Sequence, residues 1–488
     1  MSSNVDPIVQ QAQQDFQRLI AYLTGPETQH QTAYTVELTL FRRLLALGAA
    51  LLRLFFLTRA ASRPAAPTAP DGTLMTYHDQ RPTTYYSVFG KVCFPRHYFT
   101  APGQPGTCPL DAALSLPTRC YSDLLCEWAT YGVSDAAYRE SQALVKHILG
   151  LPVSVQALER VTTTAAADVD AFYQQAPEPT TPLPLGSVLV VQADGKGVPM
   201  VQTPPDTPPV RLGKGQKRTK KKEAIVTALY TIAPYRRTPQ DVLAALLHEP
   251  CRVDQPSRPQ PVHKEVRATL AGKAVAITTL QQRTAQRDLR PITTRVALTD
   301  GAESLQDQIV AAFPDHTLIL DIIHASEYLW DTATALLGET NPARQPWVRV
   351  KLEQVLLGQT TMVITALEAE AANPTRTAAQ QHALRRTIGY YTRNQRYMRY
   401  DAYLAQGWPI GTGVVEGACG HLVKDRMEQA GMRWTQPGAQ AVLDLRAVRL
   451  NGDWEAYWQF HRHQQHRRRY GTEAATASPE AQVLQMAA

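Results

Sequence analysis

The chain has 488 residues, with 50 lysines and arginines against 43 aspartates and glutamates, and a formal net charge of +7. A chain of this length can bury the cores of roughly two to four domains, which excludes a small module held together by disulfides. The mild basic excess suits a polyanionic partner. The most apolar run, residues 38–57, contains three arginines, which excludes a membrane span there.

Six cysteines are scattered along the chain, and no signal peptide precedes them. This pattern predicts a reduced, cytoplasmic setting without disulfides. Cys93 and Cys108 lie near His97, but a structural zinc site needs four such ligands, and closely spaced cysteine pairs are missing. We therefore expect buried thiols here rather than a structural zinc.

The first 120 residues divide into a helical part and a β-rich part. In residues 1–60 apolar side chains recur at helical spacing, which predicts two helices that form a packing or dimerisation element. A linker rich in proline and alanine follows at residues 62–72. Residues 83–100 are dense in aromatic and β-branched side chains around a glycine, which predicts a β-hairpin within a small β domain at residues 73–120.

Residues 121–175 form a predicted helical region. Two helical patterns flank the sequence GLPVS at residues 150–154, an arrangement that resembles a helix-turn-helix with residues 155–173 as its second helix. All-helical packing units contain the same kind of turn, so DNA reading and simple packing remain alternative interpretations. The proline-rich residues 176–186 predict a linker and a domain boundary.

Beyond this boundary the pattern becomes α/β. Apolar runs predict strands at residues 187–193, 198–202, 223–232, 293–299 and 317–320, with helices at residues 261–286, at 302–313 and after Asp321. The order βββαβαβα is the layout of a ribonuclease H-like fold, in which helices cover a mixed sheet. We assign this core to residues 186–334 and 405–450, with an all-α insertion at 335–404 and a basic helix and tail at 451–488.

Cations concentrate in a polar loop at residues 211–222, in a helical stretch at residues 385–399 and at residues 462–469. The tyrosines and arginines of residues 390–403 could stack on bases and meet phosphates, although the same stripe could be a core face with a solvated edge. We favour DNA contact. The predicted DNA-binding residues are Lys214, Lys217, Arg218, Lys220, Lys221, Lys222, Arg393, Arg396, Arg399, Lys424, Arg426, Arg433 and Trp434.

Residues 410–434, IGTGVVEGACGHLVKDRMEQAGMRW, place one carboxylate on a helix face that lacks side chains. At helical spacing, Gly413, Gly417 and Gly420 cluster beside Glu416. Glycine within a helix costs about 1 kcal/mol relative to alanine, so three glycines indicate that another group approaches closely. That group is either a metal-bound phosphodiester or a neighbouring helix.

Two predicted strands end in aspartates, Asp194 and Asp300. Two Mg²⁺ or Mn²⁺ ions about 4 Å apart can activate a water or a 3′-hydroxyl and stabilise the leaving oxygen of a phosphodiester. Such ions prefer oxygen ligands, so Asp194, Asp300 and Glu416 together could hold them. Singly, a strand-end aspartate is ordinary turn chemistry and a helical glutamate is usually solvated. Their joint placement in this strand order favours a metal site.

Five motifs together resemble a known family. They are Asp194-Gly195-Lys196-Gly197, Leu298-Thr299-Asp300-Gly301, the pair Asp321 and His324, IGTGVVEG at residues 410–417, and Gly431-Met432-Arg433-Trp434. Over residues 83–460 the chain resembles a bacterial insertion-sequence DDE transposase of the ISKra type, a group similar to the Mutator-like and hAT transposases. The resemblance implies metal-dependent DNA cleavage and strand transfer by Asp194, Asp300 and Glu416. It also implies a nucleoid-associated homodimer or higher homo-oligomer that binds terminal inverted repeats and target DNA.

Asp321 also follows a predicted strand and competes with Asp300 as the second catalytic aspartate. We assign Asp300, because in related transposases the C/D-x-x-H motif, here Asp321 and His324, lies a short helix and strand downstream of that aspartate. The resemblance then places both residues near the active site, where His324 would orient DNA or a catalytic water. The alternative is a helix N-cap aspartate with a satisfied histidine.

Two other functions remain open from the sequence. The chain could be a DNA-binding protein that kept a transposase scaffold without catalysis, or a plain two-metal nuclease that cuts DNA without joining it. An intact set of three carboxylates favours an enzyme over the first, and an assay of strand transfer separates the second.

Overall fold

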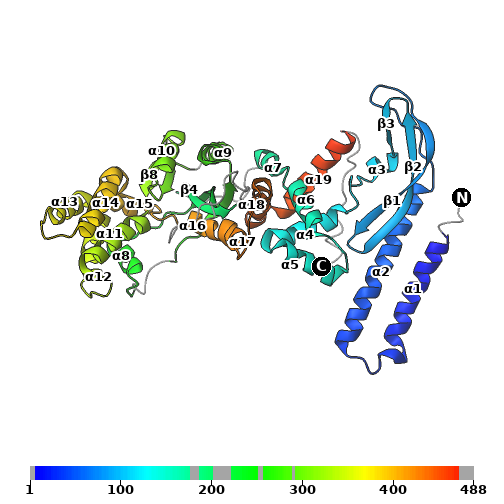
Figure 1. Cartoon of the computed structure of the whole chain (residues 1–488), viewed down its shortest axis with the longest axis horizontal. Coiled ribbons are helices and arrows are strands. Elements are labelled where there is room, and N and C mark those ends of the chain that lie inside the picture. The colour runs from blue at the N-terminus through cyan, green and yellow to red at the C-terminus, as the bar shows by residue number, and fades with distance from the viewer. Residues whose placement is uncertain (1–5, 176–185, 202–220, 251–256, 288–291, 472–488) are drawn as a thin grey trace, which may run out of the picture. The chain divides into compact units, whose positions relative to one another are not determined.

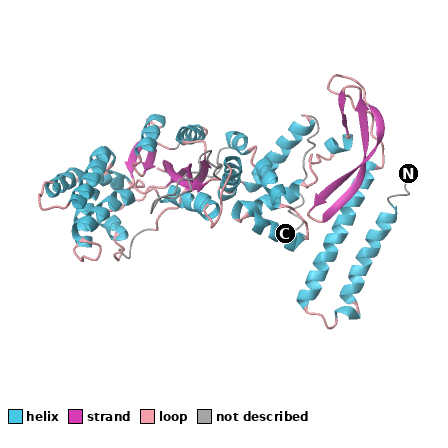
Figure 2. Cartoon of the chain, in the orientation of Figure 1, coloured by secondary structure: helices cyan, strands magenta, loops and turns pink. Residues whose placement is uncertain are grey.

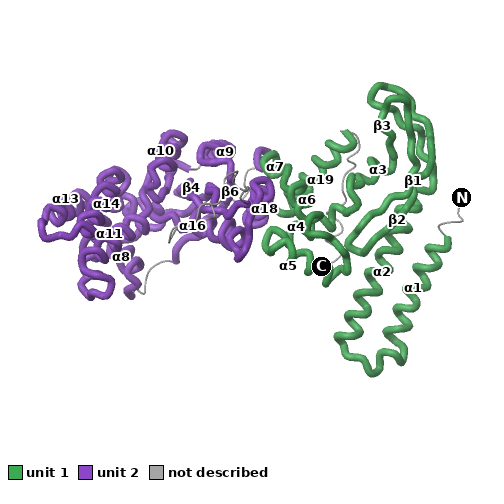
Figure 3. Tube along the Cα trace, in the orientation of Figure 1, with its two compact units in different colours: residues 1–172, 453–488 green, residues 173–452 purple. Residues whose placement is uncertain are grey.

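The computed structural model describes residues 6–175, 186–201, 221–250, 257–287 and 292–471. The chain divides into two compact units (Figure 3). Unit 1 comprises Met1–Phe172 with Asp453–Ala488, and unit 2 comprises Tyr173–Gly452. Among the helices described, none is long and apolar enough to cross a membrane. The predicted basic segment at residues 451–488 begins with a helix that belongs to unit 1, together with the N-terminal residues.

Unit 1 begins with a helical hairpin and a three-stranded antiparallel sheet (Figure 1). The two helices confirm the predicted pair, and Phe56 of the second stacks on Phe94 of the sheet with ring centroids 4.1 Å apart. The predicted β-hairpin is also confirmed, with a third short strand added. The elements are α1 (Asp6–Thr24), a 3₁₀ turn (Pro26–Thr28), α2 (Ala33–Ala60), β1 (Thr76–Ser87), β2 (Gly90–Ala101) and β3 (Gln104–Thr107).

The rest of unit 1 is helical: α3 (Pro109–Ala113), α4 (Asp123–Asp135), α5 (Tyr138–Leu149), α6 (Val155–Ala165), the start of α7 (Val169–Gln175), and α19 (Trp454–Tyr470). Gly150 ends α5 at φ 69° and Ser154 caps α6, as the helix-turn-helix pattern predicts. The predicted second helix, residues 155–173, is wrong in its length. It breaks after Ala165, where buried Asp168 bonds His461 of α19.

Unit 2 contains a mixed five-stranded sheet in the order β6-β5-β4-β7-β8 (Figure 2). The strands are β4 (Val188–Pro199), β5 (Lys221–Ile232), β6 (Val262–Thr269), β7 (Thr294–Thr299) and β8 (Thr317–Leu320). The first three in chain order pair antiparallel, and β7 and β8 continue parallel to β4. This topology is α/β and is consistent with a ribonuclease H-like core.

Two strand predictions need correction. The predicted returning strand at residues 198–202 is wrong over its described part, residues 198–201, because β4 runs straight through Asp194 to Pro199 and pairs with β5 along its whole length. Residues 261–286 are not one helix, since β6 occupies Val262–Thr269 before α9 (Lys273–Ala285) begins. Strand β6 has the sequence VHKEVRAT. Its many polar residues make the apolar face beside β5 difficult to recognise from the sequence alone.

Helices cover both faces of the sheet. Leu189, Val191 and Ala297 belong to the core under α9 and α10 (Glu303–Ala312), whereas Val190 and Leu298 belong to the core on the other face. The latter core extends into the segment predicted to be all-α, which the structure confirms. The helices of this segment are α12 (Arg344–Leu356), α13 (Thr360–Ala371), α14 (Ala378–Asn394) and α15 (Tyr400–Gln406), and the same core also includes α8 (Pro239–Leu246) and α11 (Ile322–Leu337).

The remaining elements of unit 2 follow the all-α segment. They are α16 (Gly413–Ala418), a π-helical turn (Cys419–Lys424), α17 (Asp425–Met427) and α18 (Gln436–Leu450). Gln440 of α18 bonds the backbone at the end of β6, which places α18 against the sheet edge. The α16 helix lies against β4 and β5 and carries Glu416.

Candidate functional site

Three aspartates lie at matched positions on or just after three neighbouring parallel strands: Asp194 lies within β4, and Asp300 and Asp321 come directly after β7 and β8. The last β4–β7 pair is Gln192 with Leu298, so Asp194 and Asp300 each lie two residues further on. The last β7–β8 pair is Thr299 with Leu320, immediately before Asp300 and Asp321. Since side chains two residues apart share a face of a strand, Asp194 has the same face as Gln192. This register places the three aspartates at the same end of the three parallel strands.

Gln192 ties the helix that carries Glu416 to β4. Its side chain is fully buried, and its Oε1 accepts a hydrogen bond from the Val415 backbone N–H at 2.9 Å. Its Nε2 donates to the Tyr230 hydroxyl at 3.0 Å and lies 3.4 Å from the Gly411 carbonyl. The first turn of α16 is therefore fixed over β4 two residues before Asp194, a role of Gln192 that no local sequence pattern indicates.

Asp194 lies beside the turn that follows Glu416. Its Oδ1 accepts from the Gly195 backbone N–H at 2.6 Å, and its Oδ2 accepts from the Cys419 thiol at 3.4 Å. Burial raises the pKa of Cys419, and the neighbouring Asp194 raises it further, so the sulfur stays a thiol that donates. Cys419 is three residues after Glu416, so the Asp194 carboxylate contacts the helical turn that directly follows Glu416.

Asp300 lies in a loop fixed by α14. Its Oδ1 accepts from the Ala302 backbone N–H at 2.9 Å, and its carbonyl accepts from the Tyr390 hydroxyl at 2.7 Å. Gly301 adopts φ 84°, a left-handed conformation that favours glycine, and its carbonyl accepts from Arg393. The helical segment thus positions the loop that presents the Asp300 carboxylate.

Asp321 is completely buried and caps the N-terminus of α11. Its Oδ1 accepts from the Ile323 N–H at 3.1 Å, and its Oδ2 accepts from His324 Nδ1 at 2.7 Å and from the Thr412 hydroxyl at 2.9 Å. This is the N-cap arrangement foreseen as the alternative for this pair. Because both oxygens already have donors, Asp321 positions His324 and Thr412.

Thr412 links Asp321 to Glu416. Its hydroxyl lies 2.9 Å from Asp321 Oδ2 and 2.6 Å from Glu416 Oε1, but a hydroxyl has one proton and can donate to only one of them. The other carboxylate oxygen is then in contact with the Thr412 oxygen without a proton between them, and a positive charge on His324 offsets the repulsion. The hydrogen bond that His324 donates to Asp321 raises the pKa of His324 to about 9 against the opposing effect of burial, and His324 Nδ1 lies 3.9 Å from Glu416 Oε1.

Two sets of potential ligands overlap at Glu416. Within the described ranges, one ligand atom each from Asp321, His324 and Glu416 lie within 4.8 Å of one another. Asp194 and Asp300 are outside that group, but they are partly exposed, as Glu416 is. The second set is Asp194, Asp300 and Glu416; among the described residues their ligand atoms do not form a group within that distance, but their carboxylate oxygens are the ligand type that a hard divalent cation prefers.

The glycines beside Glu416 face open space. A Cβ atom added at Gly413, Gly417 or Gly420 would meet nothing within 4 Å in the part of the chain that the structure describes. The alternative of a tight helix–helix contact is therefore not what these residues form here. A π-helical turn begins directly after α16, and such turns are frequent at functional sites. The glycine face leaves room for a substrate next to Glu416.

The predicted DNA-binding residues fall into three groups. Arg393, Arg396, Arg399, Lys424 and Arg433 are exposed, as is Lys221, whereas Lys222 is partly exposed. Lys214, Lys217, Arg218 and Lys220 lie outside the described residues.

Arg426 and Trp434 are buried, with the guanidinium 4.9 Å from the indole ring, which contradicts their assignment to a DNA surface. Trp434 instead donates from Nε1 to the Met427 carbonyl at 3.0 Å and bridges to Met200 beyond the end of β4. These two residues hold the segment after Glu416 against the sheet.

The tyrosines of residues 390–403 belong to the core. Tyr390, Tyr391, Tyr400 and Tyr403 are all buried, and the Tyr391 and Tyr400 hydroxyls donate to backbone carbonyls. Base stacking by this stripe was the wrong interpretation. The arginines between the tyrosines form its solvated edge, which was the other reading of the pattern.

Comparisons with known proteins add little to this geometry. No protein-family model and no curated protein matches the chain. Among solved structures, it is similar to the Drosophila P element transposase strand transfer complex at 9% identity and a TM-score of 0.21, covering 74% of this chain and 85% of that one. At this TM-score the similarity assigns no role to any residue, so a proposed function rests on the geometry of the site.

Proposed function

We propose that the chain is a metal-dependent DNA strand-cleaving and strand-joining enzyme, a transposase of the DDE type. The observation that carries the proposal is the register. Asp194 within β4 and Asp300 after β7 lie at matched positions of neighbouring parallel strands, and Gln192 fixes the helix of Glu416 over β4. Carboxylates held by rigid elements at one sheet edge are what two-metal phosphodiester chemistry requires.

In this proposal Asp194, Asp300 and Glu416 hold Mg²⁺ or Mn²⁺. When bound, the ions would activate a water or 3′-hydroxyl and stabilise the leaving oxygen. Thr412 orients Glu416 through its hydroxyl, and Asp321 holds Thr412 in turn. The open face at Gly417 and Gly420 admits the scissile phosphodiester.

The remaining residues of the site act through charge and position. His324, protonated and held by Asp321, places a positive charge beside Glu416 and towards the anionic substrate. The exposed cations on α14 and near Lys424 contact DNA phosphates, which fix register without reading sequence. The joining of two DNA ends is proposed to need a homodimer or a higher homo-oligomer.

The test uses the full chain and a supercoiled plasmid that carries the DNA flanking its coding region, with Mg²⁺ or Mn²⁺. We expect nicked or excised products and joined strands from the wild type. Asp194→Asn, Asp300→Asn and Glu416→Gln should each abolish both while DNA binding persists. The exposed Asp307 and Glu368 provide matched controls, since Asp307→Asn and Glu368→Gln should retain both activities.

Three results would each correct the proposal differently. DNA binding without cleavage in any metal would identify a non-catalytic DNA-binding protein. Cleavage without joined products would identify a plain nuclease. Retention of cleavage by Asp300→Asn together with its loss in Asp321→Asn would make Asp321 the second catalytic aspartate.

A further inference from the structure

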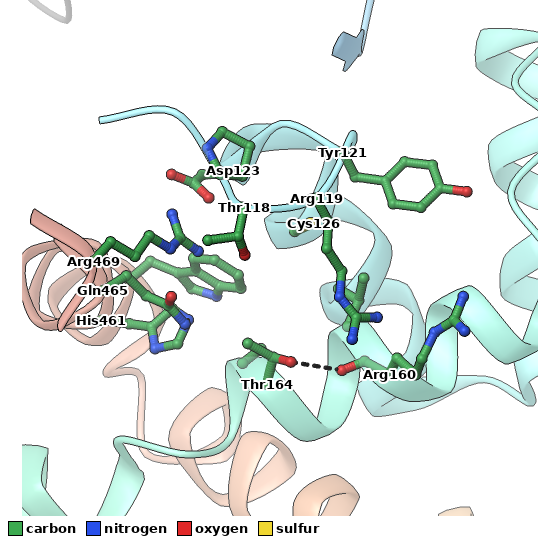
Figure 4. Close-up of a pocket in the computed structure, with 14 residues that line it drawn as sticks. Thr118, Arg119, Tyr121, Asp123, Cys126, Arg160, Thr164, His461, Gln465 and Arg469 are labelled. Atoms are coloured by element: carbon green, nitrogen blue, oxygen red, sulfur yellow. Dashed lines mark hydrogen bonds between the residues drawn. The ribbon is translucent and has the colours of Figure 1, made fainter. Parts of the chain in front are cut away.

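Unit 1 contains a cavity of about 250 Å³ that is lined by residues of unit 1 and by none of the carboxylates of the candidate site. It lies between the segment that precedes α4, the helix α6 and the helix α19 (Figure 4). An apolar cavity of about 150 Å³ is enough to hold a benzene molecule. The cavity in unit 1 is thus large enough for a ring with a substituent, which is more than an isolated ion needs.

The charged residues around the cavity are mostly cations. Arg119, Arg160 and Arg469 contribute three guanidinium groups, against one carboxyl group from Asp123. Burial raises the pKa of Asp123, although the cations of α19 oppose this shift. Figure 4 shows Arg469 on one side of the cavity and Arg119 with Arg160 on the other. A ligand for this cavity should therefore be an anion.

Two buried donors at the cavity lack acceptors. Trp458 is 2% exposed, and its Nε1 has no hydrogen-bond partner among the residues that the structure describes. The same holds for Nη1 of Arg469, also a buried atom. Both residues line the cavity and both atoms can only donate. A buried donor left unpaired is unfavourable, so the missing partner should present acceptor oxygens.

The rest of the lining suits a planar ring. Pro117, Val161 and Ala165 supply an apolar wall, and Thr118 and Gln465 supply groups that can bond a polar ring edge. Arginine guanidinium groups both stack on planar rings and bind phosphate in a bidentate manner. The lining therefore matches a phosphate joined to a hydrogen-bonding ring better than a bare phosphate.

We propose that this cavity binds one nucleotide unit, with its phosphate at Arg469 and Trp458 and its ring along the apolar wall. The unit is either a free nucleoside monophosphate or the 5′-phosphorylated terminal nucleotide of a DNA strand. Both sources share the same chemistry. The site uses only unit 1 residues, so it does not depend on the proposed metal chemistry in unit 2.

The experiment measures binding to the full chain by titration calorimetry, with EDTA present so that bound divalent metal does not contribute. The probes are the four deoxynucleoside monophosphates, inorganic phosphate, and one single-stranded oligonucleotide with and without a 5′-phosphate. The variants are Arg160→Gln and Arg119→Gln, both exposed in the free protein, and Trp458→Phe, which removes the N–H and keeps a ring. Arg139→Gln, an exposed arginine of α5 away from the cavity, is the matched control.

We expect saturable binding of a monophosphate or of the phosphorylated oligonucleotide, weakened about tenfold or more in Arg160→Gln and Trp458→Phe and unchanged in Arg139→Gln. Binding of free nucleotides identifies a small-molecule site. Preference for the phosphorylated over the unphosphorylated oligonucleotide identifies a strand-end site.

Binding of inorganic phosphate alone, equal binding by all variants, or no binding of any probe would overturn the proposal. If Trp458→Phe fails to fold, the two exposed arginine variants carry the same test. Loss of plasmid cleavage in the Asp194→Asn variant with normal nucleotide binding would show that the two sites stand or fall separately.

Discussion

Single side chains that link distant parts of the chain set the geometry around Glu416. Gln192 and Thr412 are both buried, and each bonds a partner more than 90 residues away in the sequence. Neither residue type is diagnostic of a site, and their partners cannot be found by local spacing. The carboxylates were predictable because strand ends and glycine spacing are local patterns, whereas these two supporting residues depend on how the chain returns to β4.

We predict that Thr412→Val destabilises unit 2 and impairs cleavage. The substitution preserves shape but removes the hydroxyl between Asp321 and Glu416, so whichever of these carboxylates accepts its proton loses a donor. The expected cost is about 1–3 kcal/mol. Urea unfolding and plasmid cleavage measure the two effects, with Thr412→Ser as the control that keeps the hydroxyl. Normal stability and cleavage in Thr412→Val would show that the hydroxyl does not orient Glu416.

We predict that Gly417→Ala and Gly417→Leu separate stability from activity. A Cβ atom there meets nothing within 4 Å in the described structure, and replacing a helical glycine by alanine favours folding by up to about 1 kcal/mol. Neither variant should melt below the wild type. Gly417→Leu should nevertheless lose cleavage, because its side chain occupies the face assigned to the substrate.

Melting temperature and cleavage are measured on the same samples, with Gly389→Leu as the control, since a Cβ at Gly389 also meets nothing. A lower melting temperature for Gly417→Leu with activity kept in the folded fraction would assign this face to packing instead. Such overpacking typically costs 1–3 kcal/mol.

At the scale of elements, the strands show where sequence patterns fail. Asp194-Gly195-Lys196-Gly197 is turn-like in composition, yet β4 continues through it because β5 supplies backbone partners from Val226 to Glu223. The polar side chains of β6 hide its alternation. Helices were easier to predict, since α1, α2 and the all-α segment have long apolar stripes that need no distant partner to be recognised.

The junction between α6 and α7 depends on one buried carboxylate. Asp168 accepts hydrogen bonds from His461 at 2.6 Å and from Arg468 at 2.7 Å, both on α19. Burial alone would raise the pKa of Asp168, but these two partners outweigh it and hold the value at about 2, below the ordinary 3.8. A carboxyl group whose pKa is lower in the folded state than in the unfolded state stabilises the fold at a pH above its unfolded pKa. That stabilisation is lost as the pH falls through the folded pKa.

We therefore predict that Asp168 contributes about 2 kcal/mol at pH 5 and that this contribution disappears between about pH 4 and pH 2. The wild type should be more stable than Asp168→Asn at pH 5, and the difference should shrink as the pH falls. Thermal melting of both proteins across this range is the measurement, with Asp307→Asn as the exposed control. A difference that stays constant with pH would show that Asp168 acts through shape rather than charge.

At the scale of the whole molecule, unit 2 is one continuous stretch of chain, whereas unit 1 is made of two. Tyr457 and Trp458 of α19 are buried in unit 1, and the Tyr457 hydroxyl donates to the Ala165 carbonyl. The linker composition predicts a domain boundary at residues 176–186, most of which lie outside the described residues, and the structure divides the two units between Phe172 and Tyr173. The packing of α19 with the N-terminal residues could not be predicted, because the sequence of a basic helix does not identify its packing partner.

We predict that residues 173–452 fold alone with a cooperative melting transition, because they contain both faces of their own sheet and its covering helices. Residues 1–172 alone should not, since they lack α19. Joining residues 1–172 to 453–488 through a flexible glycine–serine linker should restore a cooperative transition. Circular dichroism melting of the three proteins is the measurement, and equally cooperative melting of residues 1–172 with and without α19 would contradict the assignment.

The division of unit 1 between two segments has a consequence during synthesis on the ribosome. All of Tyr173–Gly452 is translated between the two segments, which at about 5–20 residues per second takes on the order of tens of seconds. During that interval α4–α6 have been synthesised but α19 has not, so unit 1 cannot complete its packing. The sheet of unit 2 can form in the same interval. A nascent chain therefore acquires its carboxylate site before its nucleotide-sized cavity. Messages truncated before α19 would yield a folded unit 2 attached to an incomplete, chaperone-dependent unit 1.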